Sequence, residues 1–106
     1  MTEGLDRLFA TIAARKGADP AQSYTARLLA EGVEKCAKKF GEEATEAVIA
    51  AIQKDKGALA KESADVLYHL AVLWAASGIT PEDVYAVLKS REAMSGLEEK
   101  ASRLKS

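Results

Sequence analysis

The sequence has little of several features that mark particular classes of protein. It contains one cysteine, two prolines and 6% aromatic residues, and 15 basic against 16 acidic residues give a formal net charge of -1. A single cysteine excludes an intrachain disulfide framework and a cysteine-cluster metal site. The balanced charge provides no electrostatic footprint for nucleic acid or an anionic membrane. We therefore expect neither nucleic acid nor a membrane among the partners of this chain.

Long hydrophobic runs are also missing. The most apolar stretch, residues 64–76, covers about 13 residues, whereas a membrane span needs roughly 20. The amphipathic N-terminal segment MTEGLDRLFATIAARK lacks the apolar core of a signal peptide. A hydrophobic content of 48% excludes wholesale disorder. We therefore expect one domain, residues 1–106, in a soluble cytoplasmic protein.

No segment alternates apolar and polar residues as half-buried strands do, so we expect an all-α fold, a helical bundle of about four to five helices. Ser23 or Thr25 can cap a short helix, and Gly78 suits the end of a later one. Thr80 and Pro81 suit the start of the last helix. The predicted helices cover residues 3–16, a short segment ending near 32, 33–53, 58–77 and 81–91, with a polar turn at 54–57 and a polar tail at about 93–106.

The helix predicted at 58–77 is apolar on nearly every side, so several neighbours must cover it. A chain this small has few other helices to do so. We therefore expect a homodimer, or a larger assembly, with this helix near the subunit contact. In the helix at 33–53, the predicted apolar stripe consists of Val33, Ala37, Phe40, Ala44, Val48 and Ala51.

Acidic residues recur at a spacing of three on both of these helices. Glu43 and Glu46 share one flank, whereas Glu42 points about 100° away. On the next helix, Glu62 and Asp65 share a face, and the only histidine, His69, lies one turn beyond Asp65. A short turn between two antiparallel helices brings both acidic pairs to similar levels.

Carboxylates at this density repel one another by about 3 kcal/mol per pair, at a separation of about 6 Å and an effective dielectric constant of about 20. Protonation or a cation must relieve this repulsion, and an all-oxygen set suits Mg²⁺ or Mn²⁺. Such a site is typical of phosphoryl or nucleotidyl chemistry. Two simpler interpretations stay open: a solvated helix face paired with lysines, and a helix N-terminus favoured by the helix dipole.

The two acidic motifs resemble the Glu-Glu-x-x-Glu and Glu-x-x-Asp pattern of the MazG-like all-α nucleoside triphosphate pyrophosphatases. Further stretches are similar to the stand-alone phosphoribosyl-ATP pyrophosphatase family within that superfamily. They are SYTARLLAEG, KKFGEEATEAVIAA, ADVLYHLAVL, GITPEDVYAVLKSR and the tail segment SGLEEKASR, so the resemblance covers nearly the whole chain. It implies a homodimeric, Mg²⁺-dependent enzyme that hydrolyses phosphoribosyl-ATP to phosphoribosyl-AMP and pyrophosphate, in the second step of histidine biosynthesis.

Carried over by position, the resemblance implies a metal site formed by Glu43, Glu46, Glu62 and Asp65, with Mn²⁺ as a possible substitute for Mg²⁺. It also implies that Glu42 orients a water or a basic side chain, or reaches a second ion, and that one of these five carboxylates is the base for the attacking water. The predicted substrate-binding residues are Lys39 first, then Lys38, then Arg15, Lys16, Ser23, Tyr24, Thr25, Tyr68 and His69.

Several roles stay open at this point. Ser23 and Thr25 either cap a helix or contact the nucleotide, and His69 either contacts substrate, hydrogen-bonds Asp65 or is a core histidine. Cys36 is predicted to be a small buried residue. The acidic motif is equally compatible with a house-cleaning (deoxy)nucleoside triphosphate pyrophosphatase. A helical dimerisation module without catalysis is the alternative from another functional class.

Overall fold

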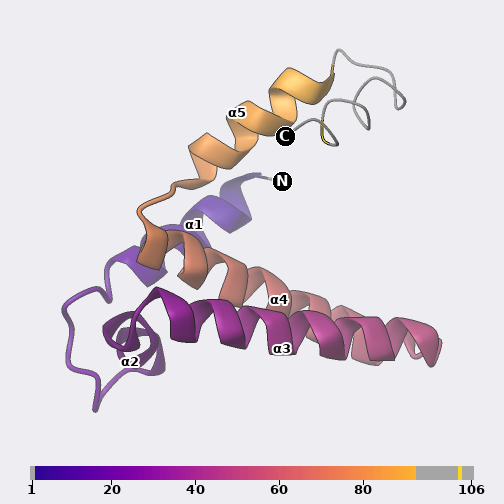
Figure 1. Cartoon of the computed structure of the whole chain (residues 1–106), viewed down its shortest axis with the longest axis horizontal. Coiled ribbons are helices and arrows are strands. Elements are labelled where there is room, and N and C mark those ends of the chain that lie inside the picture. The colour runs from indigo at the N-terminus through magenta and orange to yellow at the C-terminus, as the bar shows by residue number, and fades with distance from the viewer. Residues whose placement is uncertain (1, 93–102, 104–106) are drawn as a thin grey trace.

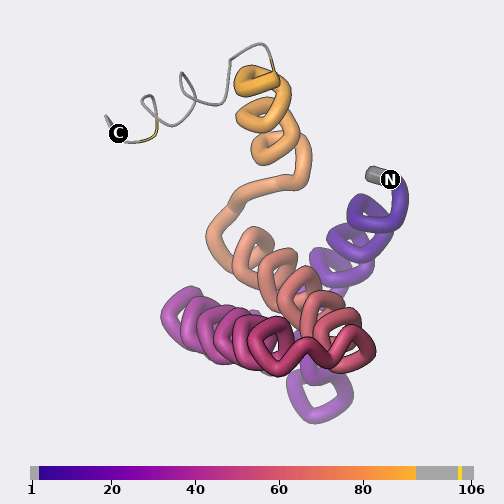
Figure 2. The backbone as a smooth tube through the Cα atoms, turned by 90° about the vertical axis from the view of Figure 1, so that its right-hand side faces the viewer, coloured from indigo at the N-terminus to yellow at the C-terminus, as the bar shows by residue number. Residues whose placement is uncertain are grey.

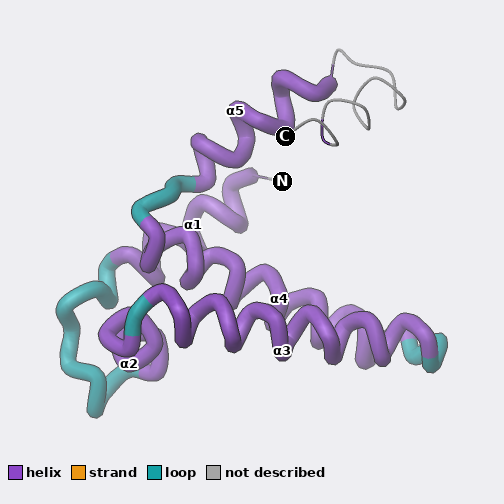
Figure 3. Tube along the Cα trace, in the orientation of Figure 1, coloured by secondary structure: helices purple, strands orange, loops and turns teal. Residues whose placement is uncertain are grey.

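A computed structural model describes residues 2–92 and 103. It contains five helices and no strand in this described part of the chain (Figures 1 and 3). They are α1 (Thr2–Ala13), α2 (Tyr24–Glu31), α3 (Val33–Ile52), α4 (Lys56–Ser77) and α5 (Pro81–Glu92). The all-α prediction is confirmed. The predicted tail at 93–106 lies, apart from residue 103, outside the described residues.

Helices α3 and α4 form a long antiparallel hairpin, and they lie side by side along their whole length (Figures 1 and 2). Helix α2 lies across the end of the hairpin that is far from its turn, and α1 packs against the C-terminal half of α4. Helix α5 projects away from the hairpin on the same side as α1 (Figure 2). The hairpin is therefore the part of the fold that positions the acidic motifs.

The predicted apolar stripe of α3 is wrong in part. Val33, Ala37, Val48 and Ala51 are exposed, whereas the side facing α4 carries Cys36, Phe40, Glu43, Ala47 and Ala50, all buried or half-buried. These five residues follow one another at spacings of four and three, the repeat of packed antiparallel helices. Alanine is too common on α3 for hydrophobicity alone to identify the packed face. Glu43 therefore lies inside the helix–helix contact.

The core lies where α1 and α2 meet the end of the hairpin that is away from its turn. Its fully packed members are Ile12, Leu28, Cys36, Ala71, Val72 and Ala75, with Leu8, Phe9, Leu29 and Tyr68 against them. The thiol of Cys36 donates a hydrogen bond to the Leu28 carbonyl oxygen at 3.3 Å, and burial raises the pKa of that thiol. The prediction of a small buried cysteine is confirmed.

Capping residues set the helix boundaries. Ser23, rather than Thr25, caps α2, because its hydroxyl accepts from the Ala26 amide at 3.1 Å. Thr80 and Asp83 cap α5 reciprocally, and Gly78 ends α4 in the left-handed conformation at φ 77°. The predicted turn at 54–57 ends two residues too late, since the Asp55 carboxylate accepts from the Ala58 amide at 3.0 Å and α4 starts at Lys56.

The first helix also ends earlier than predicted, at Ala13, because the chain turns over residues 14–17 towards Gly17 at φ 83°. At the other end of the chain, the Tyr85 hydroxyl donates to Asp6 at 3.2 Å and ties α5 to α1. None of the described helices is long and apolar enough to cross a membrane.

The cap at Asp55 generates a stability prediction. Asp55→Ala should lower the free energy of unfolding by about 1 kcal/mol, because the Ala58 amide loses its acceptor at an exposed helix start. Asp55→Asn retains a capping oxygen and serves as the matched control, with a smaller loss. Urea unfolding followed by circular dichroism measures both. Equal stability of Asp55→Ala and wild type would contradict the assigned cap.

Candidate active site

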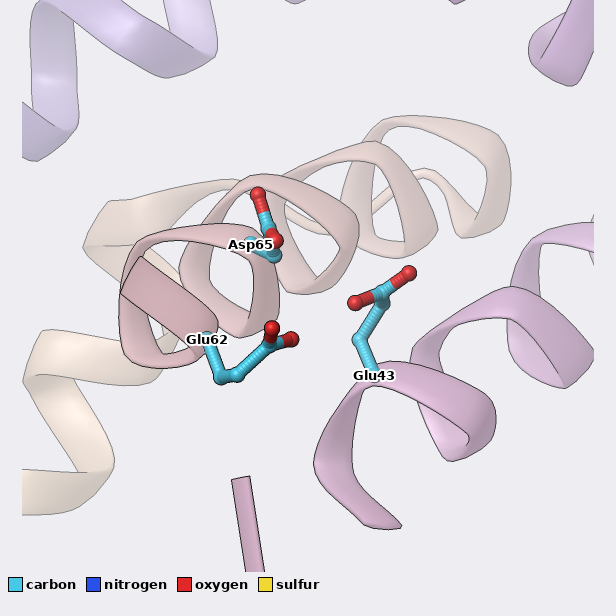
Figure 4. A group of neighbouring side chains, drawn as sticks. All are labelled: Glu43, Glu62 and Asp65. Atoms are coloured by element: carbon cyan, nitrogen blue, oxygen red, sulfur yellow. The ribbon is translucent and has the colours of Figure 1, made fainter. Parts of the chain in front are cut away.

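Three carboxylates from the hairpin converge on one space. Glu43 extends from α3, and Glu62 and Asp65 extend from α4 towards it (Figure 4). One oxygen from each carboxylate lies within 4.8 Å of the others, and all three residues are half-buried. The helix spacing explains the arrangement, because Glu62 and Asp65 are one turn apart on the face of α4 that meets Glu43. The structure therefore brings three of the four predicted metal ligands together.

Glu62 contributes a buried oxygen to this acidic cluster, defined as Glu43, Glu62 and Asp65. Its side chain is 17% exposed, and its Oε1 lies 3.8 Å from the Lys61 ammonium. Its Oε2 is buried and has no hydrogen-bond partner in the described part of the chain. A buried carboxylate oxygen without a donor is costly. A hard divalent cation fits this set of oxygen donors and would satisfy that atom.

The other two acidic residues lie outside the cluster. Glu46 is exposed and lies one turn closer to the hairpin turn, where it lines a shallow hollow together with Glu62 and Gln53. Glu42 points away, as its angular position predicts, and its Oε1 lies 3.3 Å from the Lys39 ammonium. The predicted approach of the two acidic pairs across the hairpin is therefore seen for Glu43, Glu62 and Asp65, while Glu46 lies outside the cluster.

The predicted basic residues differ in their surroundings. Lys39 lies one turn before Glu43 on α3, and the Glu42 carboxylate raises the pKa of its ammonium, so Lys39 is charged at neutral pH. Lys38 is exposed beside it. Arg15 and Lys16 are exposed in the turn after α1. Of these four basic residues, Lys39 is the one that forms an ion pair within the described part of the chain, with Glu42 beside the cluster.

Three aromatic rings connect α2 to α4 next to the cluster. The Tyr68 and Thr25 hydroxyls share a hydrogen bond, and Thr25 lies inside α2 rather than at its N-cap. The His69 ring meets Tyr68 edge-on at a centroid distance of 5.0 Å and Tyr24 at 6.4 Å. His69 Nδ1 is buried without a hydrogen-bond partner among the described residues, so this nitrogen does not bond Asp65. Among the open alternatives for His69, its packing favours a core position.

A pocket of about 420 Å³ lies beside this aromatic group, between α2 and α3. We call it the basic pocket, and its lining residues are Tyr24, Arg27, Leu28, Glu31, Lys35 and Lys39. The sequence predictions missed Arg27 and Lys35. Helical spacing contained the signal for both, because Arg27 lies three residues after Tyr24 and Lys35 four residues before Lys39.

The pKa of His69 is lowered from its ordinary value of 6.5. Burial is the main cause, because it disfavours the charged imidazolium, and the Lys39 ammonium adds to the effect. Asp65 and Glu42 act in the opposite direction but do not overcome it. His69 is therefore neutral in the folded chain at neutral pH.

The chain is similar to known proteins over most of its length, including the hairpin that carries the acidic cluster. The family model described as "Phosphoribosyl-ATP pyrophosphohydrolase" matches residues 5–92. A protein of Parvibaculum lavamentivorans named phosphoribosyl-ATP pyrophosphatase is 64% identical over 93% of this chain and 91% of its own length. Proteins with the same name from Cereibacter sphaeroides and Paracoccus denitrificans are each 61% identical, over 93% and 94% of this chain and 96% and 93% of their own lengths.

The buried histidine predicts how stability depends on pH. The unfolded chain takes up a proton near pH 6.5, whereas folded His69 resists it, so its contribution to stability is complete above that pH and is lost as pH falls towards the lower folded pKa. His69→Phe keeps an aromatic ring and removes the only histidine. Its melting temperature should fall less than that of wild type between pH 7.5 and 5.5. If the melting temperatures of wild type and His69→Phe fell equally between pH 7.5 and 5.5, this account would be contradicted.

Proposed function

The chain belongs to the phosphoribosyl-ATP pyrophosphohydrolase family, and we infer from this that it hydrolyses phosphoribosyl-ATP to phosphoribosyl-AMP and pyrophosphate at the acidic cluster. This reaction is the second step of histidine biosynthesis. The observation that carries the placement of the site is the convergence of Glu43, Glu62 and Asp65 within 4.8 Å in the hairpin. An enzyme acting on this nucleotide belongs in the cytoplasm, and we propose that location.

The chemistry requires one water and one base. The water oxygen forms a new bond to phosphorus, the phosphoanhydride bond that joins pyrophosphate to the nucleotide breaks, and the water gives up a proton. The carboxylates supply the base, and Glu43, Glu62 and Asp65 all face the same space (Figure 4). These three residues would hold Mg²⁺, or Mn²⁺ in its place, and Glu46, one turn away on α3, would be the fourth ligand.

A divalent cation held there would supply Lewis-acid chemistry, polarising phosphate oxygens and lowering the pKa of water. Positive side chains then complete the binding of the triphosphate. Lys39 is held by Glu42 at 3.3 Å beside the cluster, and it is the residue that we assign to the phosphates. Glu42 therefore acts by positioning this lysine, one of the roles predicted for it.

The substrate distinguishes this enzyme from the house-cleaning pyrophosphatases, which share the acidic motif. The family model extends from residue 5 to residue 92, and so covers α2 and α5 as well as the hairpin. The relatives that are 61–64% identical all bear the name phosphoribosyl-ATP pyrophosphatase. These observations favour phosphoribosyl-ATP over ordinary nucleoside triphosphates and favour an enzyme over a dimerisation module.

A homodimer is the assembly that we propose. Several large apolar side chains are exposed on the hairpin of the single chain, among them Val48, Ile49 and Ile52 on α3 and Leu67 on α4. Ile52 is 74% exposed, an unusual state for an isoleucine on a packed helix. A second copy of the chain covers this surface and supplies the neighbours that α4 needs on its remaining sides.

The assignment of the acidic cluster is tested by neutral substitutions. Glu43→Gln and Asp65→Asn should each lower pyrophosphate release from phosphoribosyl-ATP at least about 100-fold, because each removes a ligand charge from the site. Both should also lose the rise in melting temperature that Mg²⁺ gives wild type. Glu34→Gln, on the exposed first turn of α3, is the matched control.

The same assay includes each common nucleoside triphosphate, with and without Mg²⁺. Preference of wild type for an ordinary triphosphate would overturn the proposed substrate. Near-normal turnover by both cluster variants would overturn the proposed site, whichever substrate is used.

The proposed dimer is tested by placing a charge on its apolar surface. Leu67→Glu should shift the mass measured by light scattering from that of two chains towards that of one, because burial of an unpaired carboxylate is costly. Ala86→Glu, at an exposed position of α5, makes the same charge change of -1 elsewhere and should leave the mass unchanged. A wild-type protein with the mass of a single chain would contradict the dimer.

A further inference from the structure

We propose that the basic pocket binds the phosphate monoester of the phosphoribosyl arm, and that Arg27 and Lys35 thereby select phosphoribosyl-ATP over ordinary nucleoside triphosphates. The inference rests on the proposed function, because it concerns the end of that substrate that does not react. Phosphoribosyl-ATP differs from ATP by a second ribose that carries its own phosphate. An enzyme that prefers this substrate needs a second anion site, separate from the one that holds the triphosphate.

The charge of the basic pocket suits a phosphate monoester. Arg27 and Lys35 contribute two cations that are not assigned to the triphosphate, against the single carboxylate of Glu31. A phosphate monoester carries about -1.5 to -2 charges at pH 7. Within the described part of the chain, neither Arg27 nor Lys35 lies within 4.0 Å of a carboxylate oxygen, so both are available to an anion.

The guanidinium of Arg27 is held in place by an aromatic ring. Its central carbon lies 5.2 Å from the centroid of the Tyr24 ring, a cation–π contact. Tyr24 in turn meets His69 edge-on at 6.4 Å, and His69 belongs to α4. A planar guanidinium held this way presents paired donors to phosphate oxygens with little loss of side-chain freedom. The basic pocket is therefore anchored to the same helix that carries Glu62 and Asp65.

The basic pocket lies further from the hairpin turn along α3 than the acidic cluster. Lys39 precedes Glu43 by one turn and Lys35 precedes it by two, which places them about 6 and 12 Å from Glu43 along the axis of α3. None of the three cluster carboxylates lines the basic pocket. A substrate whose triphosphate lies at the acidic cluster therefore extends along α3, past Lys39, with its second phosphate at Arg27 and Lys35.

Phosphoribosyl-AMP and AMP distinguish binding of the phosphoribosyl arm from binding of the triphosphate. Only phosphoribosyl-AMP has the phosphoribosyl arm, and both nucleotides lack pyrophosphate. Calorimetry should show that wild type binds phosphoribosyl-AMP more tightly than AMP. Arg27→Gln and Lys35→Gln should each weaken phosphoribosyl-AMP binding about 10- to 100-fold, the loss of charged hydrogen bonds, and leave AMP binding unchanged. Glu31→Gln, which removes the negative charge from the basic pocket, should strengthen phosphoribosyl-AMP binding.

Arg7→Gln, on the exposed face of α1, removes the same charge away from the basic pocket and should change neither affinity. In turnover assays, Arg27→Gln should raise KM for phosphoribosyl-ATP with little change in kcat, because its contact is the same in substrate and transition state. Equal losses of AMP and phosphoribosyl-AMP affinity in Arg27→Gln and Lys35→Gln would overturn the assignment. It would also be overturned if these variants bound pyrophosphate more weakly but still distinguished the two nucleotides as wild type does. Unchanged phosphoribosyl-AMP affinity in both variants would overturn it as well. Failure of wild type to release pyrophosphate from phosphoribosyl-ATP would instead contradict the proposed function.

Discussion

The packing of α3 against α4 is the contact on which both the fold and the acidic cluster depend. Glu43 occupies a position in the stripe through which α3 meets α4, between Phe40 and Ala47, and Glu62 is half-buried opposite it. Hydrophobic residues at such positions would stabilise the hairpin, whereas carboxylates repel one another and lose hydration there. The hairpin is held together instead by the small and apolar residues on either side and by the core at its far end.

That core explains how the carboxylates of Glu43 and Glu62 are tolerated in the contact between α3 and α4. Ile12 from α1 and Leu28 from α2 pack with Ala71, Val72 and Ala75 of α4, at the end of the hairpin away from its turn. This anchoring fixes the register of α4 against α3, and so the level at which Asp65 faces Glu43. Rigid support from apolar packing is the general requirement for a site whose ligands repel in the absence of their cation.

The helix α2 joins two chemically different surfaces. Through Thr25 and Tyr24 it contacts Tyr68 and His69 on α4, next to the acidic cluster. Through Arg27 and Glu31 it forms one wall of the basic pocket. The acidic cluster and the basic pocket are separated by a short length of α3. The proposed binding of a nucleotide that is anionic at both ends requires such an arrangement.

The sequence by itself determined the helices, their caps at Thr80 and Gly78, and the two acidic motifs, because capping chemistry and residue spacing are local properties. It also indicated that Glu42 points away from the other carboxylates. Only the tertiary structure decided that Glu43 meets Glu62 and Asp65 while Glu46 is exposed, and that Arg27 and Lys35 share a pocket. On an alanine-rich helix several faces are equally able to pack, so the choice among them depends on contacts between residues distant in sequence.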